Sequence, residues 1–328
     1  MLHPMEAMST TKKIEETMWG LTTTARTRSL CWVAVCTLLG SCGSEEITGP
    51  ATDNTLFTSV TLAAAAGGFT NLSSSVPDAS GQVIYFVATG PNGPGVFQVP
   101  AAGGTPTEIS AGTPFSQPTD IVLSTNGSTI VVADPAAESG NGAIYQLTPP
   151  NTTPIPVAAT NGTAPVAVDL RQESGVDNIY YCGTKDGEKS LFKITASGLE
   201  VLHKGAPLNQ PTGIVVANDG AIYIADQGTV HRLSGGAITQ IASGLRMGSP
   251  AGITLTPDQK TVVVSSKSSE GKAQVDVIPL AGGSRTVFNK VIGANSAPGG
   301  LHGARNANGF TGVYCWADRT AGIYRLQP

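Results

Sequence analysis

Short apolar runs separated by turn residues make up most of the chain. The stretch "PTGIVVANDGAIYIAD", from Pro211 to Asp226, holds two apolar runs on either side of Asn218-Asp219-Gly220. Asn, Asp and Gly tolerate positive φ, so this turn predicts a β-hairpin. No helical period persists after the first fifty residues, and we therefore expect strands throughout the body of the protein.

The hairpin recurs six times. Every copy adds a third strand, and the first five copies add a fourth, with the alternation of apolar and polar positions expected for a strand with one packed face. The copies start at Phe69, Pro118, Pro165, Pro211, Pro250 and Pro298, about 39 to 49 residues apart. Four strands at this period are typical of propeller blades. We predict an all-β, six-bladed β-propeller with four antiparallel strands per blade.

The sixth copy is one strand short. It ends at Pro328 after its third strand, whereas Thr55–Ala64, before the first copy, resembles the fourth strands of the other copies. We predict that this N-terminal strand completes the last blade, which closes the ring and covers two strand edges. The propeller domain is then residues 55–328.

The N-terminus has a different pattern. Arg26 and Arg28 precede an apolar run of about ten residues, Leu30–Leu39, which fits a secretory signal and is too short for a membrane span. The ending Leu39-Gly40-Ser41-Cys42 resembles the lipobox of bacterial lipoprotein signals. This resemblance implies a signal peptide at residues 1–41, lipidated Cys42, and a polar tether over residues 42–54.

Two points about this segment stay open. The first is whether this is a lipoprotein signal or an ordinary signal peptide with an unmodified cysteine. The second is the translation start, because starting at Met8 or Met18 gives a shorter n-region than starting at Met1 does. Gly43 after the cysteine, read by the sorting pattern of enteric bacteria, implies an outer-membrane protein facing periplasm or surface. We expect a lipid-anchored protein of the bacterial cell envelope, with the membrane as one partner.

Composition and cysteine placement exclude several classes of function and of chemical site. The net charge of −4 gives no basic surface for nucleic acid. Cys182 and Cys315 fall in the third and sixth copies, on opposite sides of a six-bladed ring, whereas a disulfide needs Cα atoms within about 7 Å. We predict two free, buried thiols and a monomeric domain. The chain has no zinc-protease, nucleophile-elbow, phosphate-loop or Cys-x-x-Cys motif.

The strings "PTGIVV…DGAIYIADQGTVHRL" and "PAGITLTPDQKTVVVSS" resemble the NHL repeat and the senescence-marker/gluconolactonase-like propellers. That group contains lactonases, esterases and pure binding scaffolds, so the resemblance implies the fold more firmly than an activity. In such propellers the starts of inner strands and the ends of second strands open on one face. The candidate ligand-binding residues on that face are Asn71, Asp120, Asp134, Asp226, His302 and Asp318.

Each candidate also has a structural interpretation. The repeated acids Asp134, Asp226 and Asp318 fit a turn role, because an Asp at a strand end accepts backbone N–H bonds. His302 fits a satisfied core histidine, while His203 and His231 fall in outer strands and are expected at the surface. The resemblance implies that the lactonase members bind a divalent metal through Glu, Asn and Asp side chains at the strand starts. At these positions in this chain only Asn71 and Asp120 offer oxygen ligands. Calcium takes about six to eight oxygens, so the match to a metal site is poor.

The sequence therefore favours a binding or protein-interaction module, with a protein or small-molecule ligand that it does not name and no predicted cofactor. A gluconolactonase-like hydrolase, with a metal such as calcium at the channel mouth, is the alternative.

Overall fold

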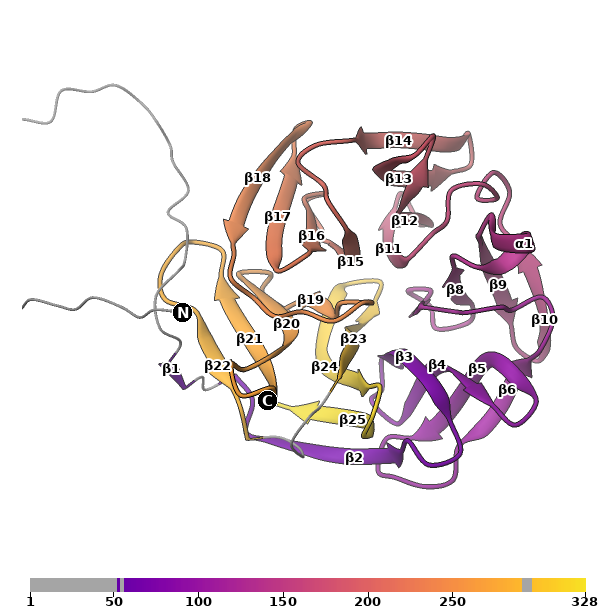
Figure 1. Cartoon of the computed structure of the whole chain (residues 1–328), viewed down its shortest axis with the longest axis horizontal. Helices are drawn as coiled ribbons and strands as arrows, with labels where there is room; N and C mark the ends of the chain where they lie inside the picture. The colour runs from indigo at the N-terminus through magenta and orange to yellow at the C-terminus, as the bar shows by residue number, and fades with distance from the viewer. Residues whose placement is uncertain (1–51, 54–55, 291–296) are drawn as a thin grey trace, which may run out of the picture. The chain divides into compact units, whose positions relative to one another are not determined.

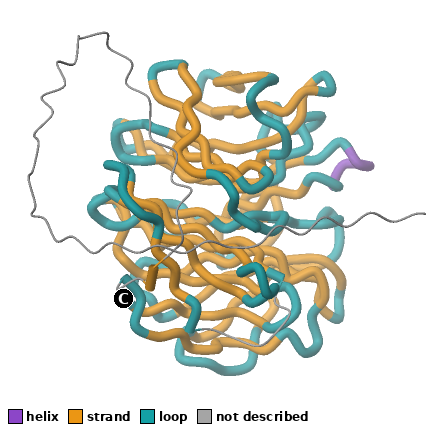
Figure 2. Tube along the Cα trace, turned by 60° about the vertical axis from the view of Figure 1, so that its left-hand side comes forward, coloured by secondary structure: helices purple, strands orange, loops and turns teal. Residues whose placement is uncertain are grey.

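Six β-sheets surround a common axis in the computed structural model (Figure 1). The structure describes residues 52–53, 56–290 and 297–328. The predicted signal peptide, Cys42 and nearly all of the tether lie outside the described residues. Strands connected by loops make up almost all of the described chain (Figure 2).

Each of the first three blades is a four-stranded sheet whose strands follow one another in chain order. Blade 1 contains β3 (Thr70–Pro77), β4 (Val83–Gly90), β5 (Gly93–Pro100) and β6 (Thr107–Ala111). Blade 2 contains β7 (Asp120–Leu123), β8 (Ile130–Asp134), β9 (Ala143–Thr148) and β10 (Asn151–Pro156), with the short α1 (Ala137–Gly140) between β8 and β9. Blade 3 contains β11 (Ala167–Glu173), β12 (Val176–Lys185), β13 (Glu188–Thr195) and β14 (Gly198–Lys204).

The last three blades continue the pattern, and two of them gain a strand from the N-terminal side. Blade 4 contains β15 (Pro211–Val216), β16 (Ile222–Asp226), β17 (Thr229–Ser234) and β18 (Ala237–Ala242). Blade 5 contains β19 (Ile253–Leu255), β20 (Thr261–Lys267), β21 (Ala273–Pro279), β22 (Thr286–Phe288) and β1 (Thr52–Asp53). Blade 6 contains β23 (Pro298–Asn306), β24 (Gly309–Asp318), β25 (Gly322–Gln327) and β2 (Ser59–Ala65). The predicted fold class is confirmed.

The N-terminal strand closes the ring as predicted. β2 pairs antiparallel with β25, from Ser59 opposite Gln327 to Ala65 opposite Gly322. The side chain of Phe57, just before β2, is buried between Phe288 of blade 5 and Tyr314 of blade 6, at ring-centroid distances of 5.8 and 5.3 Å. One pairing was not predicted: β1 adds to the outer edge of blade 5, parallel to β22.

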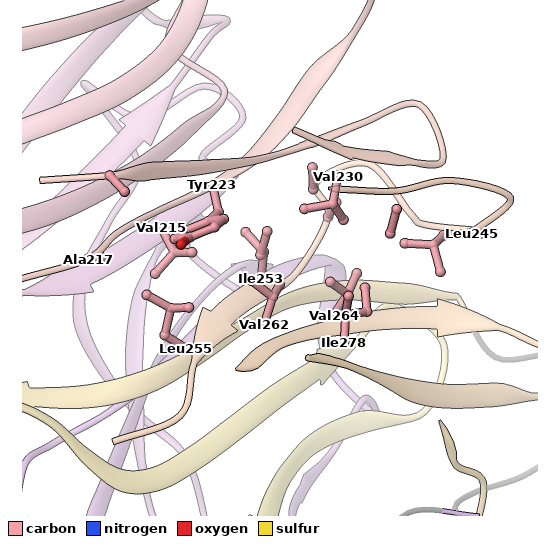
Figure 3. Packing of buried hydrophobic residues seen from close by; sticks show 14 of the residues in the cluster. Val215, Ala217, Tyr223, Val230, Leu245, Ile253, Leu255, Val262, Val264 and Ile278 are labelled. Atoms are coloured by element: carbon pink, nitrogen blue, oxygen red, sulfur yellow. The ribbon is translucent and has the colours of Figure 1, made fainter. Parts of the chain in front are cut away.

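The core lies between neighbouring blades. Val215 and Tyr223 of blade 4 pack in one cluster with Ile253, Val262 and Val264 of blade 5 (Figure 3). Inner strands such as β15 and β16 are buried at every position, while the outermost strand β18 is largely exposed. The continuously apolar inner pair and the alternating outer pair predicted from the sequence follow from this packing.

The two thiols behave as predicted. Cys182 in β12 and Cys315 in β24 are free and buried, and burial raises the pKa of both. No helix among the described residues is long and apolar enough to cross a membrane.

Candidate functional site

The antiparallel order gives the propeller two distinct faces. The innermost strand of each blade begins at one face, which we call the entry face, and turns into the second strand at the other, which we call the hairpin face. The turns predicted at Asn126-Gly127 and Asn218-Asp219-Gly220 lie on the hairpin face, where Gly127 and Gly220 have φ of 72° and 90°. The six predicted ligand-binding residues belong to strands that open towards the entry face.

Three of those six residues share one structural role. Asp134, Asp226 and Asp318 are the last residues of β8, β16 and β24, and all are buried. The Asp134 carboxylate accepts backbone N–H bonds from Ser116, Gln117, Ala136 and Ala137 at 2.7–3.1 Å.

The other two acids are bonded in the same way. Asp226 accepts the backbone N–H groups of Asn209 and Gln210, and Asp318 accepts those of Ala297, Thr320 and Ala321. Each acid ties the connection entering its blade to the end of the second strand, and Asp134 and Asp318 also order the following turn. The turn role predicted for Asp134 and Asp318 is confirmed; Asp226 serves the preceding connection.

Asp120 and His302 meet at the axis, although 182 residues separate them in the chain. The Asp120 carboxylate lies 2.8 Å from His302 Nε2 and accepts bonds from Ser74 Oγ at 2.6 Å and from the Val168 N–H at 2.9 Å. Both side chains are buried. Burial by itself lowers the pKa of His302, but the charge and hydrogen bond of Asp120, together with the charge of Asp169, outweigh burial and raise that pKa above 6.5.

A second buried pair lies further along the axis. Arg305 Nη2 contacts Asp169 Oδ2 at 2.6 Å and donates to the Val216 carbonyl at 2.6 Å, and the guanidinium lies 3.9 Å from the centre of the Phe310 ring. Burial raises the pKa of Asp169, and the charge of Arg305 opposes that rise. These two pairs connect β23 to blades 2 and 3, so blade 6 is tied across the axis.

Glycines allow the inner strands to approach this closely. A Cβ on Gly300 would lie 2.0 Å from Ser74 Oγ, and one on Gly252 would lie 2.2 Å from the Leu301 nitrogen. Such distances exclude any side chain. At these strand starts glycine offers no side chain that could bind a ligand. The structure shows that Gly300 and Gly252 are packing positions, where β23 contacts β3 and β19.

A polar cavity opens at the hairpin-face end of the axis. Its volume is about 240 Å³, and we call it the axial cavity. It is lined by the ends of β11 and β23 and by hairpins of blades 2, 4 and 6. The lining residues are Thr125, Arg171, Gln172, Asn218, Arg305, Asn306, Ala307, Asn308 and Gly309.

Hydrogen bonds hold this lining in place. Arg171 donates to the Asn218 carbonyl at 2.9 Å and pairs with Glu173 at 2.9 Å, while Gln172 Nε2 donates to Thr125 Oγ1 at 2.9 Å. Arg305 lines the cavity, and its contacts to Asp169 and the Val216 carbonyl both use Nη2, so Nε and Nη1 have no hydrogen-bond partner among the described residues. Asp169 pairs with Arg305, and Glu173 pairs with both Arg171 and Lys193, so the cavity is polar without a large net charge.

Two further sequence predictions concern Asn71 and His231. Asn71 is exposed and its amide donates to Thr89 Oγ1 at 3.5 Å. Ligand binding by Asn71 and the five buried residues stays a prediction. The surface position expected for His231 is wrong: it is buried beside Asp226, at 3.7 Å. β17 is the third strand of blade 4 and pairs with β16 on one side and β18 on the other, so His231 does not lie at the edge of the blade.

Sequence reasoning missed Asp169, Arg171, Gln172 and Arg305. A signal was present: Arg171 and Arg305 each stand near the end of an innermost strand, just before the hairpin turn, in a chain with only 13% charged residues. An arginine inside an otherwise buried strand needs an internal partner. For a metal, the described residues contain no group of three or more His, Cys, Asp or Glu side chains placed to hold one.

The described residues define a six-bladed β-propeller, with a packed axis and a polar cavity at one end of it. Within that class, residues 208–235, which contain the first strands of blade 4, match the family model of the NHL repeat. No curated protein matches the chain.

Solved structures resemble the fold. The nidogen/laminin complex structure aligns with a TM-score of 0.54 and 17% identity over 66% of this chain and 80% of that chain. TolB from Acinetobacter baumannii aligns with a TM-score of 0.50 and 11% identity over 78% and 63%. An auxiliary nutrient binding protein from Bacteroides ovatus aligns with a TM-score of 0.52 and 13% identity over 80% and 70%. At these identities the likeness shows the fold alone.

Proposed function

We propose that this propeller is a binding module whose ligand enters the axial cavity at the hairpin face. The observation that carries the proposal is the lining of that cavity, where Asp169 holds Arg305 and two nitrogens of Arg305 have no acceptor within the described part of the chain. A side chain held by packing and by hydrogen bonds is preorganised, which lowers the entropic cost of binding. Similarity of fold to a nutrient binding protein and to a protein of the nidogen/laminin complex is compatible with this function.

The cavity limits the ligand to a small polar group. Drug-sized ligands occupy roughly 300–1,000 Å³, so about 240 Å³ suits a smaller molecule or one side chain of a protein partner. The amides of Gln172, Asn218, Asn306 and Asn308 offer both donors and acceptors. We infer a neutral ligand rich in hydroxyl or amide groups, because the two arginines already have acidic partners.

Binding tests of the full chain use calorimetry with a hexose, an N-acetylhexosamine and a short neutral peptide as probes. Gln172 is exposed, so Gln172→Trp fills the cavity mouth without removing a core contact and is expected to abolish binding. Gln172→Ala removes one hydrogen-bonding group and is expected to weaken binding about 2- to 12-fold. Gln82→Ala, an exposed glutamine in the blade 1 hairpin, is the matched control. No binding by any probe, or equal binding by Gln172→Trp, contradicts the proposal.

We further propose that Cys42 anchors the module to a bacterial envelope membrane through a lipid. The resemblance of Leu39-Gly40-Ser41-Cys42 to a lipobox supports this. In a bacterial host, labelled palmitate is expected in the wild-type chain and in Cys182→Ser, and not in Cys42→Ser. Label retained by Cys42→Ser contradicts lipidation at this residue.

A further inference from the structure

A second cavity, with three cationic side chains, lies in blade 5 away from the axis. Its volume is about 290 Å³, and we call it the basic pocket. It lies where the connection from blade 4 passes the end of β20 and the loop between β20 and β21. The pocket is lined by Gly244, Arg246, Lys267, Ser268, Ser269, Gln274, Arg285 and Val287.

The positive charges in this pocket exceed their internal partners. Arg246 Nη1 makes one long contact, 3.4 Å to the Ser269 carbonyl, and Arg285 Nη1 pairs with Asp276 at 3.2 Å. Arg285 Nε is buried and has no hydrogen-bond partner within the described chain. The Lys267 ammonium likewise has no hydrogen-bond or ion-pair partner among the described residues.

The nearby acids do not balance these cations. Asp276 is fully buried and already accepts hydrogen bonds from Ser266 Oγ and Gln274 Nε2, with Arg285 as its ion-pair partner. Glu270, in the loop beside the pocket, pairs with Lys272 at 3.0 Å and is exposed to solvent. Two of the three lining cations therefore lack a carboxylate among the described residues.

Backbone contacts fix the cations relative to one another. The Lys267 N–H donates to the Arg246 carbonyl at 3.0 Å, which joins the blade 4 connection to the end of β20. Ser268 Oγ accepts the backbone N–H groups of Glu270 and Lys272, which closes the loop. Arginine and lysine side chains brought together in this way attract an oxyanion, since each donates charge-assisted hydrogen bonds to its oxygens.

We propose that the basic pocket binds a phosphate group through Arg246, Lys267 and Arg285, with the hydroxyls of Ser268 and Ser269 as further donors. Phosphate offers several strong acceptor oxygens and matches the surplus of positive charge. The group belongs either to a soluble phosphorylated molecule or to a phospholipid headgroup, since both present the same oxyanion. This site is separate from the axial cavity and does not rest on the function proposed for it.

The test titrates the full chain with inorganic phosphate, against sodium chloride of equal ionic strength, and follows the thermal midpoint and the heat of binding. Phosphate is expected to raise the midpoint, and chloride is not. Lys267→Gln is expected to weaken phosphate binding at least fivefold without lowering the midpoint in the absence of phosphate, since its ammonium has no hydrogen-bond or ion-pair partner among the residues that the structure describes. Arg246→Gln/Lys267→Gln is expected to abolish binding.

Lys272→Gln is the matched control, because this lysine is in the same loop but pairs with Glu270. Equal weakening in Lys272→Gln and Lys267→Gln, or phosphate stabilisation no larger than that of chloride, would overturn the proposal. A second arm measures sedimentation of a Cys42→Ser chain with phosphatidylglycerol or phosphatidylcholine vesicles. Retention on the anionic vesicles that Lys267→Gln removes assigns the headgroup as the source. Phosphate binding without such retention assigns a soluble ligand.

Discussion

His302 and Asp120 link a protonation step to the stability of the fold. Burial and the charge of Arg305 lower the folded pKa of His302, but Asp120 and, to a smaller extent, Asp169 outweigh them and raise it above the unfolded value of 6.5. Below about pH 6.5 the histidine is charged in both states, and the ion pair contributes its full stabilisation. As pH rises through the folded pKa the proton is lost, and this contribution disappears.

We expect the free energy of unfolding of the wild type to fall as pH rises above 6.5, by at most about 1.4 kcal/mol per pH unit from this one group. In His302→Gln this part of the slope is expected to be absent. Urea denaturation between pH 6 and pH 9 measures both slopes. Burial lowers the pKa of His231, so this histidine changes the slope only below pH 6.5. Its effect is present in both the wild type and His302→Gln, and it serves as an internal comparison between the two curves. Parallel curves for wild type and His302→Gln would contradict the assignment.

Asp169 and Arg305 permit a direct measurement of a buried ion pair. Removing one partner leaves the other charge buried, which typically costs about 3–5 kcal/mol. We expect Arg305→Met and Asp169→Leu to destabilise by this amount each, and the double variant to lose much less than their sum. Urea denaturation of all four chains gives the coupling energy. An additive double variant would show that the contact between the carboxylate and the guanidinium contributes little.

At the scale of elements, the strands were predictable and the axis was not. Turn residues such as Asn126-Gly127, and the contrast between continuous and alternating apolar runs, act over a few residues and are visible in the sequence. The pairing of Asp120 with His302 depends on how closely β23 can approach β3, which is set by Gly300 against Ser74, a residue of the neighbouring blade that lies far away in the sequence. β1 was missed because two residues carry no pattern.

The repeated strand-end acid is an element-scale device, because one carboxylate holds two backbone segments. Asp134 accepts four backbone N–H groups from the connection before blade 2 and from the turn after β8. Asp134→Asn keeps the shape of the side chain but removes its charge. It also places the amide NH2 group, a hydrogen-bond donor, against backbone N–H groups that are donors themselves. We expect a loss of about 1.5–3 kcal/mol in unfolding free energy, measured by urea denaturation. Asp219→Asn, exposed in a hairpin turn of blade 4, is expected to cost under about 0.5 kcal/mol. Equal losses would contradict this role.

At the scale of the whole molecule, stability depends on joining the two ends of the chain. β2 supplies the outer strand of blade 6, and Phe57 fills a site between blades 5 and 6 with 2% of its surface exposed. Without them β25 presents an unpaired edge, which invites association with other chains. β2 thus joins the two ends of the chain within one sheet, and β3 of the first blade packs directly against β23 and β24 of the last blade.

A chain that begins at Ala66 lacks both β1 and β2, whereas a chain that begins at Leu56 lacks only β1. We expect the Leu56 chain to melt within a few degrees of the longer protein and the Ala66 chain to melt far lower and to self-associate.

Loss of Phe57 alone accounts for about 3–5 kcal/mol, so Phe57→Ala in the full chain is expected to show that cost without loss of the fold. Differential scanning fluorimetry and light scattering measure these outcomes. β2 is held by backbone bonds to β25, by the Ser59–Gln327 side-chain bond and by one packed face. A synthetic peptide of residues 56–66 is therefore expected to restore the thermal midpoint of the Ala66 chain, and a peptide with Phe57→Ala to restore it less. Equal midpoints for the two truncated chains would show that ring closure does not depend on β2.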